Sequence, residues 1–273
     1  MKETLSISHP RIGMLRLQEM PRLDWFHKHD ELECNLIVQG RGAYLVGEQR
    51  VDLQPNSILW LFPEQEHLML DQTDDFKIWI LVMKPDYLAQ LCVDETSQTL
   101  LERKPTGSFL RHVSQPQFDQ LLALCQTVAD TQEKIACYNA GLGYLLMAAW
   151  SAFQEGSVVP LNAPIHPVIE RIVKYIRTDQ SPNDLETVAA LVGLAPETVS
   201  RLFKRQMGIS LTAFRNRCRV DRFLDLYGHG HTLTMLEAAT MAGFGSYAQF
   251  YRVFVQVMKI TPAAYRRQLV MQQ

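Results

Sequence analysis

Short runs of apolar residues, separated by turn residues, fill the chain from residue 22 to residue 84. These runs are LECNLIVQG, GAYLVGEQRVDL, SILWLF and KIWILVM, and they end at Gly40, Gly47-Glu48, Pro63 and Pro85. Strands of this length, about ten residues apart and bounded by glycine or proline, are typical of a β-sandwich or β-barrel. The pattern therefore predicts an all-β unit at the front of the chain.

Beyond Pro85 the apolar residues recur at helical spacing, where before they occurred in short strand-like runs. Residues 116–130 and 133–154 place apolar side chains at helical spacing. The second segment is apolar almost all round, which predicts burial on more than one side, against the barrel or against a second subunit. Its Gly141 and Gly143 would allow another backbone to approach closely.

A segment without helical or strand period follows. Residues 155–167, EGSVVPLNAPIHP, contain three prolines and one glycine. Since proline fixes φ and donates no backbone hydrogen bond, we expect a stiff, extended linker here.

The helical C-terminal part repeats itself. Residues 185–208 (LETVAALVGLAPETVSRLFKRQMG) are followed about fifty residues later by residues 236–259 (LEAATMAGFGSYAQFYRVFVQVMK). In both, an alanine stands four residues before a glycine, at Ala189 and Gly193 and again at Ala239 and Gly243. A small residue where two helices cross, a glycine at the turn and a following helix describe a helix-turn-helix unit.

The second helix of each unit has one apolar and one polar face. A solvated surface would explain the polar face of a single helix, but its duplication favours recognition of DNA. Arginine suits guanine edges, and lysine and tyrosine suit phosphates. The predicted DNA-binding residues are Pro196, Glu197, Ser200, Arg201, Lys204, Ser246, Tyr247, Tyr251 and Arg252.

A helix is predicted between the two units, capped by Ser210 and ended by Gly228. Eighteen residues span about 27 Å, comparable with the roughly 34 Å between successive major-groove faces. Such a rod would hold both second helices on one side of a duplex. We expect its arginines to favour phosphates; these are Arg215, Arg217, Arg219 and Arg222.

Two further helix starts are predicted from capping residues. Thr234 and Glu237 form the pattern of a capping box, and Thr261-Pro262 is typical of the start of a last helix.

Charge divides the chain at the linker. Residues 165–273 carry 14 Lys and Arg against 8 Asp and Glu, whereas residues 1–164 carry 13 against 21, within an overall net charge of −2. A basic C-terminal part favours an anionic polymer as its partner.

No run approaches the roughly 18 apolar residues of a membrane span, and the first residues do not form a secretory signal. Five scattered cysteines indicate reduced thiols, so we expect a cytoplasmic protein without a membrane partner.

The stretch FHKHDELE, residues 26–33, holds candidate chemistry. On a strand, His27, His29 and Glu33 would share one face, and His67 begins a later strand that could lie beside them. The spacing H-x-H-x-x-x-E-x6-G, ending at Gly40, resembles the cupin barrel motif, although the glycine usual before the last histidine is missing.

Two interpretations of these residues remain open. His27, His29, Glu33 and His67 could hold a divalent transition metal, or they could line a ligand pocket, which we favour. Tryptophan rings could stack on a sugar or another flat ligand, or belong to the core. The predicted effector-binding residues are Trp25, His27, His29, Glu33, Trp60 and His67; no cofactor and no catalytic residue is predicted.

Residues 168–267 resemble the DNA-binding domain of the AraC/XylS family of bacterial transcription regulators. The resemblance is carried by L-x-x-V-A-x-x-V-G-L, V-S-R-L-F-K-R-x-x-G, Arg219, A-G-F, F-Y-R-V-F and T-P-A-A-Y-R-R. It implies a cupin-like effector barrel in front, followed by helices that dimerise. The chain departs from the family pattern in three places: Val255-Gln256 replaces a lysine pair, Lys259 replaces a glycine, and Ala195 replaces a polar cap. We therefore expect the first unit to read bases more specifically than the second.

These observations predict an α+β multidomain protein. Residues 1–110 form a cupin-like effector-binding barrel, 111–154 a helical dimerisation segment, 155–167 a linker and 168–273 an all-α DNA-binding domain with two helix-turn-helix units. The predicted function is a ligand-responsive regulator, not an enzyme, that binds double-stranded DNA as a homodimer, with a small molecule such as a sugar as effector and RNA polymerase as a candidate partner. The alternative is a metal-dependent cupin enzyme with an attached DNA-binding domain, and a constitutive DNA-binding protein is a third reading.

Overall fold

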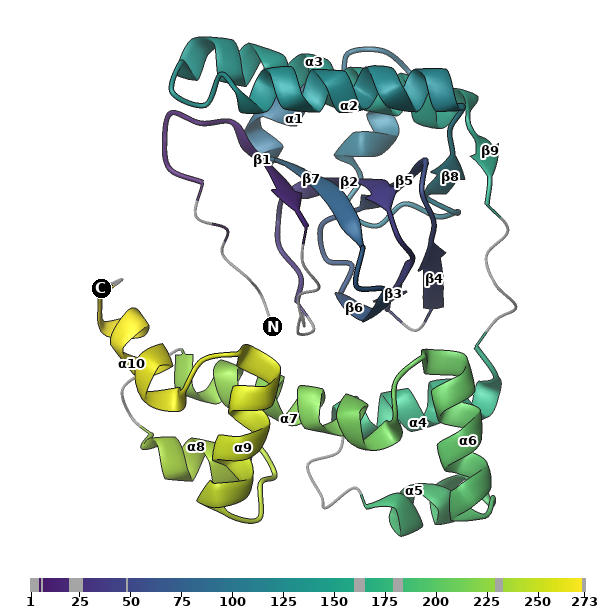
Figure 1. Ribbon diagram of the computed structural model, residues 1–273, viewed down its shortest axis with the longest axis vertical. Helices are drawn as coiled ribbons and strands as arrows, with labels where there is room; N and C mark the ends of the chain where they lie inside the picture. Colours follow the sequence, from purple (N-terminus) through teal and green to yellow (C-terminus); the bar gives the residue numbers. More distant parts are fainter. Residues whose placement is uncertain are drawn as a thin grey trace.

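The computed structural model describes residues 5, 7–19, 27–47, 49–159, 165–178, 184–228 and 233–271. The described part comprises a β-rich N-terminal unit, two long helices above it and a helical C-terminal unit below it (Figure 1). This is an α+β architecture with an N-terminal barrel and a C-terminal all-α domain, as the hydrophobic pattern predicted.

Two antiparallel sheets form the barrel. The larger has strand order β1-β7-β2-β5-β8-β9 and the smaller has order β4-β3-β6. The strand bounds are β1 Gly13–Gln18, β2 Leu32–Gln39, β3 Gly42–Val46, β4 Gln49–Leu53, β5 Ser57–Leu61, β6 His67–Gln72, β7 Lys77–Met83, β8 Leu110–His112 and β9 Ser157–Val158.

Alternation along each strand divides the apolar side chains between two layers. In β2, Cys34 and Leu36 belong to the core beneath the helices, whereas Ile37 belongs to the core inside the barrel. In β7, Trp79 and Leu81 likewise face the helices. The sheet is therefore buried on both faces, which explains the nearly continuous apolar run in β7.

Helices α2 (Gln115–Ala129) and α3 (Ile135–Glu155) cover the large sheet (Figure 1). A Cβ atom at Gly141 would lie 2.8 Å from Val128 Cγ2 in α2, and one at Gly143 would lie 3.2 Å from Leu91 Cδ2, at the end of α1 (Pro85–Leu91). The close approach predicted at these glycines is thus made by side chains of neighbouring helices in the same chain. A short 3-10 helix, η1 (Gln98–Leu101), completes this unit.

Seven helices make up the C-terminal unit among its described residues. They are α4 Pro167–Thr178, α5 Leu185–Val192, α6 Pro196–Met207, α7 Leu211–Gly228, α8 Met235–Met241, α9 Tyr247–Met258 and α10 Pro262–Met271. Two apolar clusters hold them together. Phe203 and Phe214 belong to the first cluster, with α4 to α7, while Phe223 and Phe254 belong to the second, with α7 to α10. Helix α7 therefore contributes to both helix-turn-helix units.

The small sheet packs on the first helix-turn-helix unit. Ala43, Leu45, Leu68 and Leu70 from β3 and β6 share a core with apolar residues of α4, α5, α6 and α7. In Figure 1 this sheet lies directly above α4 and α7, on the side opposite α2 and α3.

Several elements were not predicted from the sequence. β1 precedes the region assigned to strands, and β8 and β9 are a three-residue and a two-residue strand that pair with each other. The pairing places Ser157 and Val158 of the expected linker at the sheet edge. His27 and His29 lie before β2 rather than within a strand with Glu33, and His27 forms an isolated β-bridge with His67.

Candidate DNA interface and barrel site

The first helix-turn-helix unit is made by α5 and α6. Asp184 caps α5 by accepting a hydrogen bond from Thr187 N at 2.7 Å. Hydrogen bonds from the side chain and then the backbone of Thr187 lower the pKa of Asp184. Ala189 is buried, and Gly193 ends the helix with φ of 68°. The small residue at the crossing and the left-handed glycine at the turn have the roles predicted for them.

Helix α6 buries Val199, Phe203 and Met207, which fixes the face that it turns to solvent. Glu197, Arg201 and Lys204 are exposed, while Pro196 and Ser200 are partly buried. Ala195 stands at the N-cap of α6 and provides no side-chain hydrogen bond, because its side chain has no polar atom.

The second unit is made by α8 and α9. Thr234 and Glu237 form the predicted capping box, with Glu237 N donating to Thr234 Oγ1 and Thr234 N donating to Glu237 Oε2. Gly243 has φ of 91° in the turn. Helix α9 then starts at a capped end, because Gln249 N donates to Ser246 Oγ at 3.2 Å.

Helix α9 exposes aromatic and cationic side chains. Tyr247 and Tyr251 are 42% and 44% exposed, and Arg252 is also exposed, whereas Phe250 and Phe254 are buried. Ser246 is exposed as well, and its hydroxyl caps the helix. Both second helices therefore turn the predicted DNA-binding residues away from their cores.

Helix α7 joins the units with 18 residues, and Ser210 caps it by accepting from Ala213 N at 3.1 Å. One expectation for its arginines is wrong. Arg217 is only 6% exposed and donates from Nη1 to Met69 O at 3.0 Å and to Leu70 O at 3.3 Å, so it binds the barrel rather than a phosphate. Arg215, Arg219 and Arg222 are partly buried.

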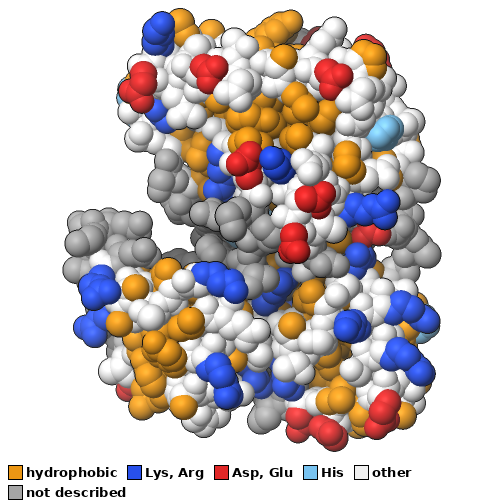
Figure 2. All heavy atoms as spheres, in the orientation of Figure 1, with side chains coloured by type: hydrophobic (Ala, Val, Ile, Leu, Met, Phe, Trp, Pro, Cys, Tyr) orange, Lys and Arg blue, Asp and Glu red, His pale blue; other side chains and the backbone are white. Residues whose placement is uncertain are grey.

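Positive side chains are frequent over the C-terminal helices. Figure 2 shows Lys and Arg side chains across this lower part of the molecule, with most of the visible Asp and Glu side chains on the barrel and its helices above. On this face of the molecule, the division of charge along the sequence is thus also a division between the upper and lower parts.

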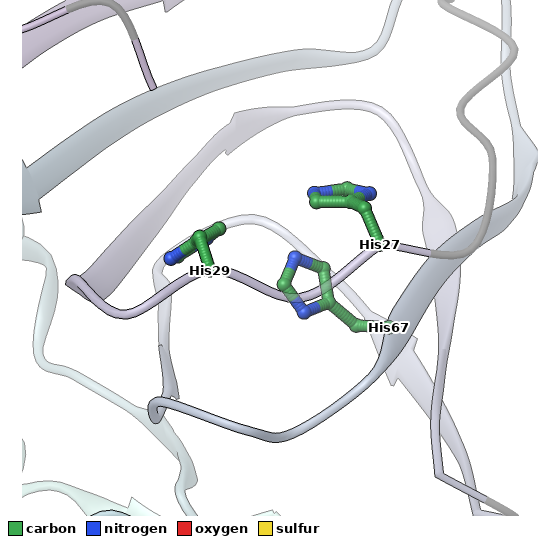
Figure 3. A group of neighbouring side chains, drawn as sticks. All are labelled: His27, His29 and His67. Carbon is green, nitrogen blue, oxygen red and sulfur yellow. The ribbon is translucent and has the colours of Figure 1, made fainter. Parts of the chain in front are cut away.

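The barrel brings four of its predicted residues together. The ring centroids of His27 and His67 are 4.2 Å apart and those of His29 and His67 are 5.5 Å apart. One nitrogen from each of the three rings lies within 4.8 Å of the others. Glu33 joins them, because its Oε2 accepts from His29 Nε2 at 3.1 Å. Figure 3 shows the three rings converging, His27 and His29 from one segment and His67 from another.

Burial and charge set the protonation of this cluster. Burial, followed by the charge of His27, lowers the pKa of His67 to about 3, so that ring is neutral at ordinary pH. Burial alone would lower the pKa of His29, but the hydrogen bond and the charge of Glu33 outweigh it and raise the value. Burial opposes ionisation of Glu33 too, yet the hydrogen bond from His29, the charge of His29 and the hydrogen bond from Asn35 hold its pKa well below the usual range.

The tryptophans do not join these residues. Trp60 lies on the face of β5 that points toward the helices and away from the barrel interior, packed edge-on against Trp150 and Phe153 of α3. Trp79 also belongs to the core beneath the helices. Trp25 lies outside the described residues.

The contacts of two buried polar residues were not predicted from the sequence. Asn35 is fully buried and donates to Glu33 Oε1 at 2.7 Å. Strand alternation could have found it, since Asn35 is two residues from Glu33 and must share its face. Arg217 could not have been found in this way, because its acceptors are carbonyl groups almost 150 residues earlier in the chain.

An N-terminal barrel with a polar site and two helix-turn-helix units joined by one helix define a class of protein, the DNA-binding regulators with a sensory domain. The family model described as an AraC-like ligand binding domain matches residues 17–140, and the model described as a helix-turn-helix domain matches residues 188–268. The chain belongs to the AraC family of regulators and combines a ligand-binding domain with a domain that binds double-stranded DNA.

Comparison with known proteins finds the following similarities. The arabinose operon regulatory protein of Salmonella typhimurium is 24% identical over 85% of this chain and 82% of its own length. The regulatory protein PocR of the same organism is 34% identical over 37% of this chain, and the match spans only a third (33%) of PocR. Among solved structures, apo ToxT from Vibrio cholerae is 14% identical, with coverage of 96% of this chain and 98% of ToxT and a TM-score of 0.39. No described helix is both long and apolar enough to cross a membrane.

Proposed function

We propose that this protein is a cytoplasmic transcription regulator that reads specific double-stranded DNA with α6 and α9 in adjacent major grooves. The single observation that carries the proposal is the pair of helix-turn-helix units on one shared helix, each with its polar face open to solvent. Helix α7 spans about 27 Å at 1.5 Å per residue, close to the distance between successive major-groove faces.

The proposed base-reading side chains are Glu197, Ser200 and Arg201 of α6 and Tyr247, Tyr251 and Arg252 of α9. Lys204 is assigned to a phosphate, Pro196 lies at the start of α6, and Ser246 orients the start of α9 through its cap. Helix α6 has exposed Arg201, Lys204 and Arg205, whereas α9 has Arg252 alone before its C-cap. This difference supports the expectation that the first unit makes the stronger contacts.

The barrel is proposed to bind a small-molecule effector, a sugar being the first class to try, with His27, His29, Glu33 and His67 as the polar groups of the site.

A groove of about 630 Å³ between α2 and α3, beside the exposed Tyr144, supports a homodimer through these helices. RNA polymerase is a further proposed partner, as expected of a regulator that acts on transcription. We assign no catalytic role to the chain. The proposed domain limits stay at residues 1–110, 111–154, 155–167 and 168–273.

Selection of binding sites from randomised duplexes, with and without candidate sugars, tests the proposal. Arg201→Ala should weaken binding to the selected duplex by about 1–3 kcal/mol and relax base preference at one position. Arg171→Ala, on α4 and outside both recognition helices, is the matched control and should leave base preference unchanged. An equal loss on selected and random duplexes would rule out base reading by Arg201.

The enzyme with an attached DNA-binding domain remains the second candidate, and the convergence of three histidines is the observation that favours it. It requires turnover of a substrate by the purified chain. A protein that responds to a ligand on DNA without converting that ligand would dismiss it.

A further inference from the structure

We propose that His27, His29 and His67 form a site for a divalent first-row transition-metal ion, and that this ion, in place of a sugar, is the effector sensed by the barrel. The effector role rests on the proposed function, whereas the site itself does not. Three imidazole nitrogens within 4.8 Å of one another are the first observation. Imidazole ligands suit zinc, copper, iron and nickel, and three protein ligands leave a position open for water or a small molecule.

His67 is already arranged as a metal ligand. Its ring is 1% exposed, and Nδ1 lies 2.9 Å from Gln65 O, so the ring proton belongs on Nδ1. The lone pair of Nε2 is buried and has no hydrogen-bond partner among the described residues. Metal-bound histidines commonly donate their second ring nitrogen to a backbone carbonyl in this way.

The groups around His29 favour a positive charge on its ring or beside it. Nδ1 lies 3.0 Å from Glu31 O and Nε2 lies 3.1 Å from Glu33 Oε2, so both ring nitrogens face acceptors. A neutral imidazole has only one N–H, and it satisfies only one of these contacts. Glu33 is 6% exposed, and a buried carboxylate needs a cation beside it. A bound ion supplies that charge, and so does a protonated His29; the experiment below separates the two.

Closure of the site would move the start of β6. With Zn–N distances of about 2.05 Å, two nitrogens on one tetrahedral ion are about 3.4 Å apart, whereas the nitrogens of this cluster lie within 4.8 Å of one another. Binding of an ion would therefore draw together any pair that is wider than about 3.4 Å. His67 and His27 are tied through their backbones, since each N–H donates to the other's carbonyl at 3.0 and 3.2 Å, so this movement is passed to the strand.

β6 connects the ion site with the DNA-binding domain. Glu66, immediately before β6, pairs with Arg177 of α4. Leu68 and Leu70 pack in the core of the first helix-turn-helix unit, and Met69 O and Leu70 O accept the hydrogen bonds of Arg217 from α7. Alternate residues of one strand thus face the ion site and the DNA-binding domain.

Titration of the full-length, chelator-treated protein with Co²⁺ tests the site, because tetrahedral Co²⁺ absorbs visible light strongly. We expect saturation at one equivalent and displacement by Zn²⁺. His27→Gln changes the least buried of the three ligands and should weaken Co²⁺ binding at least tenfold, while His9→Gln, an exposed position outside the cluster, should match the wild type. Glu33→Gln removes the carboxylate charge but keeps a polar side chain, and it should weaken binding about tenfold.

Absence of saturable binding, or equal affinity in His27→Gln and wild type, would overturn the site and leave the His29–Glu33 ion pair as the reason for the cluster. Circular dichroism and thermal melting of each variant establish that it is folded.

Fluorescence anisotropy on a duplex obtained by selection tests the effector role. We expect Zn²⁺ to change the DNA affinity of the wild type at least threefold and that of His27→Gln not at all. Binding of the ion without any effect on DNA affinity would overturn its role as effector. If no duplex is bound under any condition, the proposed function fails, and the Co²⁺ titration still decides the site.

Discussion

At the scale of single residues, two helices of the DNA-binding domain end on different residue types in the same conformation. Gly193 ends α5 with φ of 68°, and Lys259 ends α9 with φ of 58° and ψ of 10°. A residue with a Cβ atom pays about 1 kcal/mol or more in this left-handed region, whereas glycine adopts it freely. Lys259, which stands where the family has a glycine, is therefore a strained position.

Exchanging the residue types tests this strain. Lys259→Gly should raise the free energy of unfolding by about 1 kcal/mol, and Gly193→Ala should lower it by a similar amount. A Cβ atom at Gly193 would meet nothing within 4 Å, so the second change measures the backbone alone. Urea unfolding of the two variants decides the matter, and a destabilised Lys259→Gly would contradict it.

At the scale of elements, α6 and α9 start differently although they are copies of one motif. Ser246 caps α9, whereas Ala195 leaves the start of α6 with no side-chain partner. The preceding helices are both capped, by Asp184 and by Thr234 with Glu237. Among the four helices of the two units, the missing cap thus affects only α6, the helix to which the stronger DNA contacts are assigned.

Restoring the cap should stabilise the first unit. Ala195→Ser is expected to raise the free energy of unfolding by about 1 kcal/mol, and Ser246→Ala to lower it by about the same amount. Thermal unfolding of both variants checks the prediction. If Ala195→Ser left stability unchanged, the α6 start would already be satisfied in another way.

At the scale of the whole molecule, the barrel and the first helix-turn-helix unit are joined by a mixed apolar and polar contact. Leu45, Leu68 and Leu70 enter the core of the helical unit, and Arg217 donates to two barrel carbonyls. Arg50 adds a hydrogen bond to Gln206 O at 3.2 Å. β6 is therefore in direct contact with the DNA-binding domain.

Removing the polar part of this contact should destabilise the full chain. Arg217→Met keeps an apolar stem but leaves Met69 O and Leu70 O without their donor, at a cost of about 2 kcal/mol. Arg171→Met, at an exposed position of α4, serves as the control and should change stability little. Denaturant unfolding measures both, and a loss below about 0.5 kcal/mol for Arg217→Met would show that the contact is not maintained in solution.

The proposed dimer is also tested at this scale. Tyr144 is 68% exposed at the groove between α2 and α3, so Tyr144→Asp should break association through that groove without unfolding the helix. Thr127→Asp places the same charge on an exposed position of α2 outside the groove and should leave association intact. Sedimentation velocity distinguishes monomer from dimer, and an unaffected Tyr144→Asp dimer would place the interface elsewhere.

The sequence by itself determined the elements whose signals are local. Caps at Ser210 and Thr234, turns at Gly193 and Gly243, and the helical period of residues 116–130 and 133–154 all depend on neighbours a few residues away, and the structure has each of them. The duplicated motif made the two helix-turn-helix units and their family recognisable before any coordinates.

Only the tertiary structure decided which distant groups meet. β1, β8 and β9 are too short or too isolated to have a pattern of their own, and they form because a sheet edge lies beside them. Trp60 was expected near the histidines, but in β5 its side chain points toward α3. The alternation of side chains along a strand predicts which residues share a face of the sheet, but not which other element packs on that face. Arg217 lies in a helix whose composition favours a DNA backbone, and it binds the barrel because two carbonyl groups almost 150 residues earlier in the chain lie within its reach.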